Sequence, residues 1–100
     1  MKQILWDSDK NATLRRDRGV CFEDVLFALE RGDLLDRLVH PNQDKYPGQQ
    51  LLIVEIADYA YIVPYVETEE YLFLKTIIPS RKATRKYLRP HGDTDETDQR

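Results

Sequence analysis

Basic side chains gather near the end of the chain, in a segment that contains no acid. Residues 75–89 read KTIIPSRKATRKYLR. Arg81 and Arg85 are four residues apart, so they share one face of a helix. A guanidinium can bind a phosphate through two parallel hydrogen bonds. The spacing therefore indicates a phosphate site, to which Lys75 on the preceding strand could contribute. The alternative is a solvated basic face whose side chains pair with the acids at 67, 69 and 70.

Metal-free cleavage of RNA is the chemistry that such a site would serve. It needs a base for the 2′-hydroxyl, an acid for the leaving 5′-oxygen and positive charge for the crowded phosphorane. Lys75, Arg81 and Arg85 are the candidates for the positive charge. His40 is the candidate acid or base, because histidine titrates near neutral pH; the alternative is a histidine without a role at the end of a strand.

Further residues are candidates for binding the substrate rather than for the reaction itself. Tyrosines can stack on bases or donate a proton, whereas Tyr61 is better explained by cross-strand packing. Lys10 and Asn11 are expected to face outward from an early helix, where Lys10 could reach the same groove. The candidate substrate-binding residues are Lys10, Tyr46, Tyr65, Ser80, Lys82 and Thr84. No Cys or His cluster at metal-ligand spacing and no glycine-rich phosphate loop is present, so we expect no metal and no other cofactor.

Composition predicts one small domain that is polarised in charge. The chain has 100 residues and a formal net charge of −3. Its last eight residues, DTDETDQR, hold four acids and one base, and without them acids and bases number fourteen each. We therefore expect a single domain over 1–90 and an acidic, disordered tail over 91–100. The single cysteine, Cys21, and the lack of a long apolar run predict a cytoplasmic protein without a membrane span.

The elements that must position these residues follow from periodicity and from helix caps. We expect a strand at 2–5, helices at 7–18 and 21–31 that end at glycines, strands at 33–40, 50–56, 59–67 and 71–78, and a last helix at 81–89. The four later strands are predicted to form an antiparallel meander. Pro64 indicates an edge or a bulge in its strand. In the strand 33–40, Leu35 and Val39 should face one side, and Asp36 and His40 the other. The order predicts an α+β domain with the helices on one face of the sheet.

Two segments resemble a known family. LWDSDKNATLRRDRGVCFEDVL resembles the opening of BrnT-family toxins, and LKTIIPSRKATRKYL resembles their close. The resemblance covers residues 4–89 and implies a RelE-like fold, with Trp6 as a buried indole and Asp7 as a helix cap. The loop VHPNQDKYPGQ and the proline of IVPYVE depart from the family pattern.

The resemblance also implies an activity and partners. It implies a type II toxin that cleaves RNA, either free or on the ribosome, and halts translation. A ribbon-helix-helix antitoxin would neutralise it and would alone contact operator DNA. The alternative is a non-enzymatic basic subunit that acts as co-repressor with a DNA-binding partner.

Overall fold

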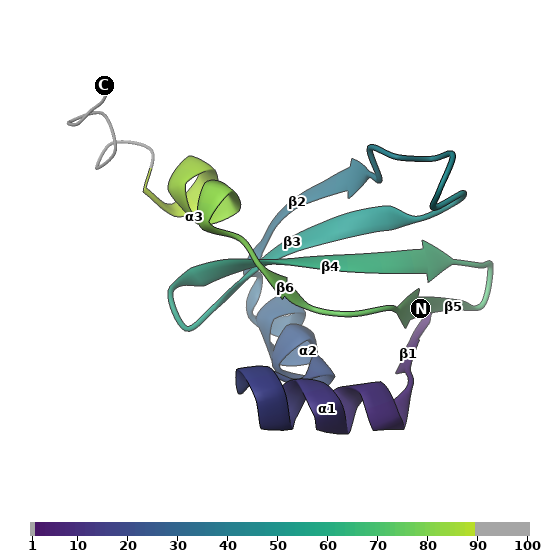
Figure 1. The fold of residues 1–100 in the computed structure, drawn as a ribbon, viewed down its shortest axis with the longest axis horizontal. Coiled ribbons are helices and arrows are strands. Elements are labelled where there is room, and N and C mark those ends of the chain that lie inside the picture. The colour runs from purple at the N-terminus through teal and green to yellow at the C-terminus, as the bar shows by residue number, and fades with distance from the viewer. Residues whose placement is uncertain (1, 90–100) are drawn as a thin grey trace.

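The computed structural model describes residues 2–89, which form an α+β globule with three helices and a six-stranded mixed sheet (Figure 1). The segment 91–100, predicted to be an acidic tail, lies outside the described residues. Within residues 2–89, no helix is long and apolar enough to cross a membrane. The elements are β1 (Gln3–Trp6), α1 (Ser8–Arg18), α2 (Phe22–Arg31), β2 (Leu34–Val39), β3 (Gln50–Ile56), β4 (Tyr59–Glu67), β5 (Tyr71–Leu74), β6 (Ile78–Pro79) and α3 (Arg81–Leu88).

The first two helices begin and end where their capping residues predict. The Asp7 carboxylate accepts hydrogen bonds from the first free amides of α1. Gly19 and Gly32 follow α1 and α2 with φ of 72° and 84°, a left-handed conformation that glycine adopts without strain. Trp6 is half-buried rather than fully buried, and its ring stacks on Phe22 at 5.5 Å.

Asn11 fixes α1 against α2, which corrects the expectation that it faces outward. Its side chain is 6% exposed. Its Oδ1 accepts a hydrogen bond from the Phe22 amide at 2.7 Å, and its Nδ2 donates to Glu23 at 2.8 Å. Asn11 thus satisfies a free amide at the start of α2, which is a structural role.

The predicted antiparallel meander is confirmed for β2, β3, β4 and β5. The sheet order is β1-β5-β4-β3-β2, and β1 pairs with β5 in parallel, which makes the sheet mixed. The last predicted strand is divided. β5 ends at Leu74, and β6 pairs separately with β4 further along.

The sequence predicts an edge or a bulge at Pro64; the residue lies inside the sheet, so the edge strand is wrong, but it stands at an irregularity of the neighbouring ladder. It pairs with Leu51 of β3 on one side of β4. On the other side, β5 leaves the ladder after Leu74 pairs with Tyr65, and β6 rejoins it at Ile62. The missing amide hydrogen of Pro64 therefore falls at the break between β5 and β6, where the interior of a sheet can tolerate proline.

A register shift in β2 overturns the predicted alternation of its side chains. The shift lies between Leu34 and Asp36. Because a bulge places two residues opposite one, Leu35 and Asp36 both reach the side of α3. Leu35 packs in the cluster beneath that helix, and the carboxylate of Asp36 accepts a hydrogen bond from Tyr87 at 2.5 Å.

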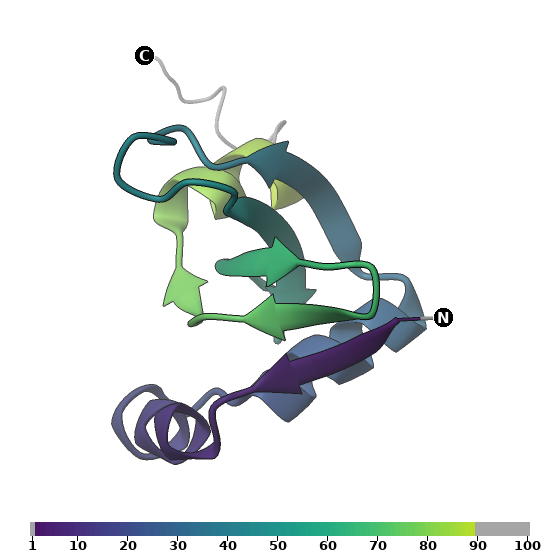
Figure 2. The same cartoon turned by 90° about the vertical axis from the view of Figure 1, so that its right-hand side faces the viewer.

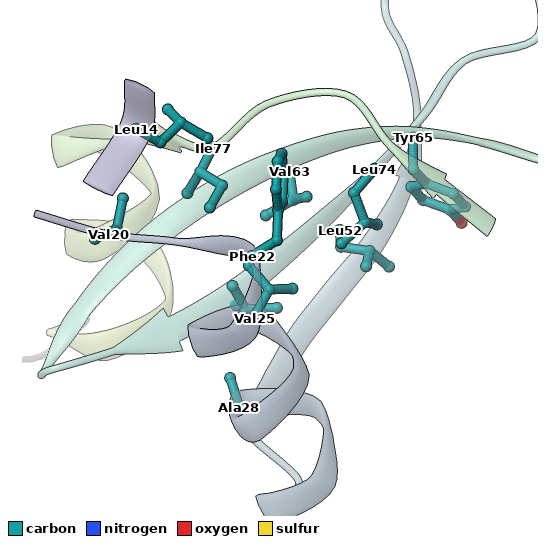
Figure 3. Close-up of a cluster of buried hydrophobic side chains, with 11 residues drawn as sticks. Leu14, Val20, Phe22, Val25, Ala28, Leu52, Val63, Tyr65, Leu74 and Ile77 are labelled. Atoms are coloured by element: carbon teal, nitrogen blue, oxygen red, sulfur yellow. The ribbon is translucent and has the colours of Figure 1, made fainter. Parts of the chain in front are cut away.

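Helices cover both faces of the sheet, which corrects the expectation of one covered face (Figure 2). On one face, α1 and α2 build the main core, in which Phe22 and Val25 pack near Val63 and Leu74 (Figure 3). On the other face, α3 packs on a smaller cluster around Ala60. The physical reason lies in β3, where residues 51–54 are all buried, as expected for a strand with two covered faces.

Candidate functional site

The last helix is fixed to the sheet by a short hydrogen-bond chain. Ser80 caps α3 as predicted, since its Oγ accepts a hydrogen bond from the Ala83 amide at 3.0 Å. The hydroxyl of Thr84 accepts from the Ala60 amide and donates to the Ser80 carbonyl, both at 2.8 Å. Thr84 is 3% exposed. Its hydroxyl therefore has a structural role within the fold, and the substrate-binding role of Thr84 stays a prediction.

Three arginines of α3 and its C-cap line one hollow beside the start of β4. Arg81, Arg85 and Arg89 follow one another at intervals of four residues, so they form one stripe along the helix. Together with Thr84 and Tyr59 they line a hollow of about 190 Å³, which we call the arginine hollow. The predicted shared face of Arg81 and Arg85 is thereby observed as a shared cavity wall.

Arg81 and Arg89 of the arginine hollow differ in their partners among residues 2–89. Arg89 donates to an Asp58 carboxylate oxygen at 3.4 Å. Within residues 2–89, Arg81 has no hydrogen bond or ion pair through its side chain. Glu67, one of the acids proposed as an alternative partner of the basic segment, instead pairs with Lys2 and Arg37. The hydrogen bond from Lys2 lowers the pKa of the Glu67 carboxyl below its ordinary value.

Tyr59 is a residue of the hollow that sequence reasoning missed. It follows the two-residue turn Ala57–Asp58 and pairs with Ile56 across it. Its ring meets Tyr61 edge-on at 5.8 Å. Its position beside three arginines is decided by where α3 crosses the start of β4, and local sequence carries no such signal. The sequence could, however, have placed Arg89 at the site, because Arg89 continues the four-residue spacing of Arg81 and Arg85.

His40 and Tyr46 lie together but far from the arginines. Their ring centroids are 4.5 Å apart, and the Nδ1 of His40 accepts a hydrogen bond from the Asn42 amide. The loop that contains them follows β2 at the end of the sheet opposite α3 (Figure 1). His40 is level with the end of β4 that is far from Tyr59. At a rise of about 3.3 Å per residue along the strand, roughly 20 Å separate the two residues. The structure does not bring the predicted acid or base to the predicted phosphate site.

The two lysines expected at the same site are also elsewhere. Lys75 is exposed and level with Pro64, and its Nζ lies 5.5 Å from the centre of the Phe73 ring. Lys10 is on α1, which packs on the opposite face of the sheet from α3 (Figure 2). Neither is among the residues that line the arginine hollow.

Tyr65 is a core residue, so its predicted role in stacking on a base is corrected. Its side chain is 0% exposed. Its hydroxyl donates to Gln50 at 2.7 Å and accepts from the Nη2 of Arg37 at 3.1 Å. The hydrogen bond that Arg37 donates to the Tyr65 hydroxyl in turn raises the pKa of the Arg37 guanidinium. The ring has no free surface on which a nucleobase could stack.

Lys82 and Ser80 face a second depression on the other side of α3. Its floor is aliphatic and formed by the sheet, and its volume is about 240 Å³. We call it the lysine groove. It is lined by Leu38, Leu51, Ile53, Ile62, Ser80, Lys82, Ala83, Lys86 and Tyr87. The helix α3 thus separates an arginine side from a lysine side.

Comparisons with family models, curated proteins and solved structures found no match to this chain. The RelE-like fold and the BrnT resemblance therefore remain predictions from the sequence. Among residues 2–89, no group of three or more His, Cys, Asp or Glu side chains is placed to hold a metal ion.

Proposed function

We propose that the chain is a metal-independent endoribonuclease of the type II toxin class, and that the arginine hollow holds the scissile phosphate. One observation carries the proposal: Arg81, Arg85 and Arg89 line a single hollow with Tyr59. Three guanidinium groups can bind and neutralise the non-bridging oxygens of a phosphodiester, and they add stabilisation as charge builds up on the phosphorane. The sequence resemblance to BrnT toxins favours RNA as the polyanion.

In this proposal Tyr59 replaces His40 as the proton-transfer group. The 2′-oxygen attacks phosphorus, the bond from phosphorus to the 5′-oxygen breaks, and a 2′,3′-cyclic phosphate and a 5′-hydroxyl result. Tyr59 donates its phenolic proton to the leaving oxygen, and water accepts the proton of the 2′-hydroxyl. Proton transfer by a positioned side chain contributes about 10²–10⁴-fold to a rate, so loss of the Tyr59 hydroxyl should be readily measurable.

The proposed biological setting is the cytoplasm, where the toxin would cleave RNA and inhibit translation. Its proposed partner is a ribbon-helix-helix antitoxin, through which alone the complex would contact operator DNA. Expression without the antitoxin should then arrest growth, and expression of an inactive variant should not.

The direct test uses the purified chain and an RNA oligonucleotide. Tyr59→Phe should abolish cleavage and leave RNA binding intact. Arg85→Lys should weaken binding by about 10–100-fold, because an ammonium cannot reproduce the planar, bidentate contact. Arg16→Lys is the matched control, since Arg16 is exposed on α1, where its side chain pairs with Asp17. RNA that stays intact with the unmodified chain would refute the nuclease.

The second candidate is a non-enzymatic subunit that binds nucleic acid through the arginine hollow, as a co-repressor would. The distance between His40 and the arginines favours it, because the hollow then contains no imidazole. RNA or DNA binding that depends on Arg85, together with normal growth on expression, would select this candidate over the nuclease.

A further inference from the structure

We propose that the lysine groove is the docking site for an acidic amphipathic helix of a partner protein. The groove lies on the side of α3 opposite the arginine hollow, so the proposal holds whether or not the chain cleaves RNA. It rests on three features of the groove: an aliphatic floor, a basic rim and incomplete coverage of the sheet.

The floor of the lysine groove is suited to apolar protein side chains. Leu38, Leu51, Ile53 and Ile62 form it, from three adjacent strands. Leu38 is 42% exposed, and Ile78 of the neighbouring β6 is 40% exposed. Single-stranded RNA is bound by aromatic stacking platforms and basic grooves, whereas this floor is aliphatic. The floor therefore favours a protein over RNA.

The rim of the groove carries two lysines that form no salt bridge within residues 2–89. Lys82 and Lys86 are four residues apart on α3, and both line the groove. In residues 2–89, neither forms a salt bridge; the Nζ of Lys86 lies 5.2 Å from the centre of the Tyr87 ring. The Asp36 carboxylate on β2 accepts a hydrogen bond from the Tyr87 hydroxyl and interacts with the charge of Lys86 without a direct ion pair. Carboxylates flanking an apolar stripe would complement this rim.

The part of this sheet face that α3 leaves uncovered indicates that the docked partner segment is a helix. The eight residues of α3 span about 12 Å at ~1.5 Å per residue. The nine residues of β4 span roughly 30 Å at ~3.3 Å per residue. A short helix thus covers less than half of this face, and a second helix beside α3 would complete the layer. The segment 91–100 cannot supply the apolar stripe, because it has no large apolar residue.

The test uses a synthetic peptide of about four helical turns, at ~3.6 residues per turn, with leucines on one stripe and glutamates on both flanks. Twin peptides carry lysines in place of the glutamates, or serines in place of the leucines. Binding of each fluorescent peptide to the full chain is followed by anisotropy. We expect the acidic peptide to bind, and each twin to bind at least about tenfold more weakly.

Variants of the chain locate the interface. Leu38→Asp should abolish binding of the acidic peptide. The double variant Lys82→Glu/Lys86→Glu should weaken it by about tenfold and should strengthen binding of the lysine peptide. Lys10→Glu is the matched control, because Lys10 is an exposed lysine on the opposite face of the sheet, and it should change neither peptide. Thermal unfolding of each variant establishes that it is folded.

Three results would overturn the proposal. One is equal binding, or no binding, of the acidic and lysine peptides. Another is competition by a short RNA that depends on Leu38, which would assign the groove to nucleic acid. The third is self-association of the chain in sedimentation that Leu38→Asp abolishes, which would assign the groove to a second copy.

Discussion

Replacing Thr84 by valine keeps the shape of the side chain and removes the hydroxyl that fixes α3 to the sheet. In the native fold, this hydroxyl is the partner of the Ala60 amide at 2.8 Å, and Ala60 is 0% exposed. The Ser80 carbonyl would keep its bond from the backbone amide of residue 84, at 3.0 Å. The principal loss is therefore the partner of one buried N–H group.

The magnitude follows from the cost of leaving that group unpaired. A buried donor without a partner costs about 1–3 kcal/mol, and the added methyl group offsets about 0.8 kcal/mol of this. We expect a net loss of about 0.2–2.2 kcal/mol in the free energy of unfolding, centred on ~1 kcal/mol. In a domain of this size, a loss of ~1 kcal/mol should lower the melting temperature by about 4–8 °C.

Urea denaturation and hydrogen exchange at the Ala60 amide are the assays. Thr84→Val should lower the urea midpoint at constant m and should abolish the exchange protection of that amide. Thr84→Ser is the control; it retains the hydroxyl and the protection and loses about 0.8 kcal/mol for one methyl group. An unchanged midpoint in Thr84→Val would refute the structural role. A selective loss of RNA binding in that folded variant would support the substrate-binding role predicted from the sequence.

Three further predictions concern other features of the fold. Ala57 adopts a φ of 53° in the β3–β4 turn, a conformation that asparagine tolerates better than alanine. Ala57→Asn should therefore raise the free energy of unfolding by roughly 0.5–1 kcal/mol. A lower urea midpoint would contradict this. The hydrogen bond from Tyr87 lowers the pKa of Asp36, so its stabilisation is present above the ordinary aspartate pKa and is lost as pH falls through the folded value. Tyr87→Phe should therefore reduce the loss of stability between neutral and acid pH, measured as urea midpoints, and an unchanged pH profile would count against the bond. Tyr65→Phe removes the donor to Gln50 and should cost about 1 kcal/mol of stability with no change in RNA affinity; weaker RNA binding would show that Tyr65 contacts the substrate.

The local elements of this protein are largely predictable from its sequence. The caps Asp7 and Ser80, and the helix-ending glycines, act on backbone groups within a few residues, so their consequences are local. Strands 50–56 and 59–67 follow from short apolar runs around a two-residue turn. The four consecutive apolar residues 51–54 also indicate a strand covered on both faces, which the expectation of helices on one face overlooked.

The candidate site was predictable only in part. The spacing of Arg81 and Arg85 depends on helix geometry alone, so their common face follows from the sequence. Tyr59 joins them only because α3 crosses the start of β4, and His40 is separated from them because β2 carries it to the other end of the sheet. Such relations depend on strand order and direction, which side-chain periodicity does not encode.

The sequence by itself determined the helices, the strands other than the divided last one, the single stripe of arginines and the excess of positive charge on the last helix. The tertiary structure decided that α3 lies on the opposite face of the sheet from α1 and α2, and that its arginines and lysines face two different depressions. The physical reason is that helix caps and periodicity depend on neighbours within a turn or two of the chain. The choice of face depends on contacts between residues far apart in sequence, such as the hydrogen bond between Thr84 and Ala60.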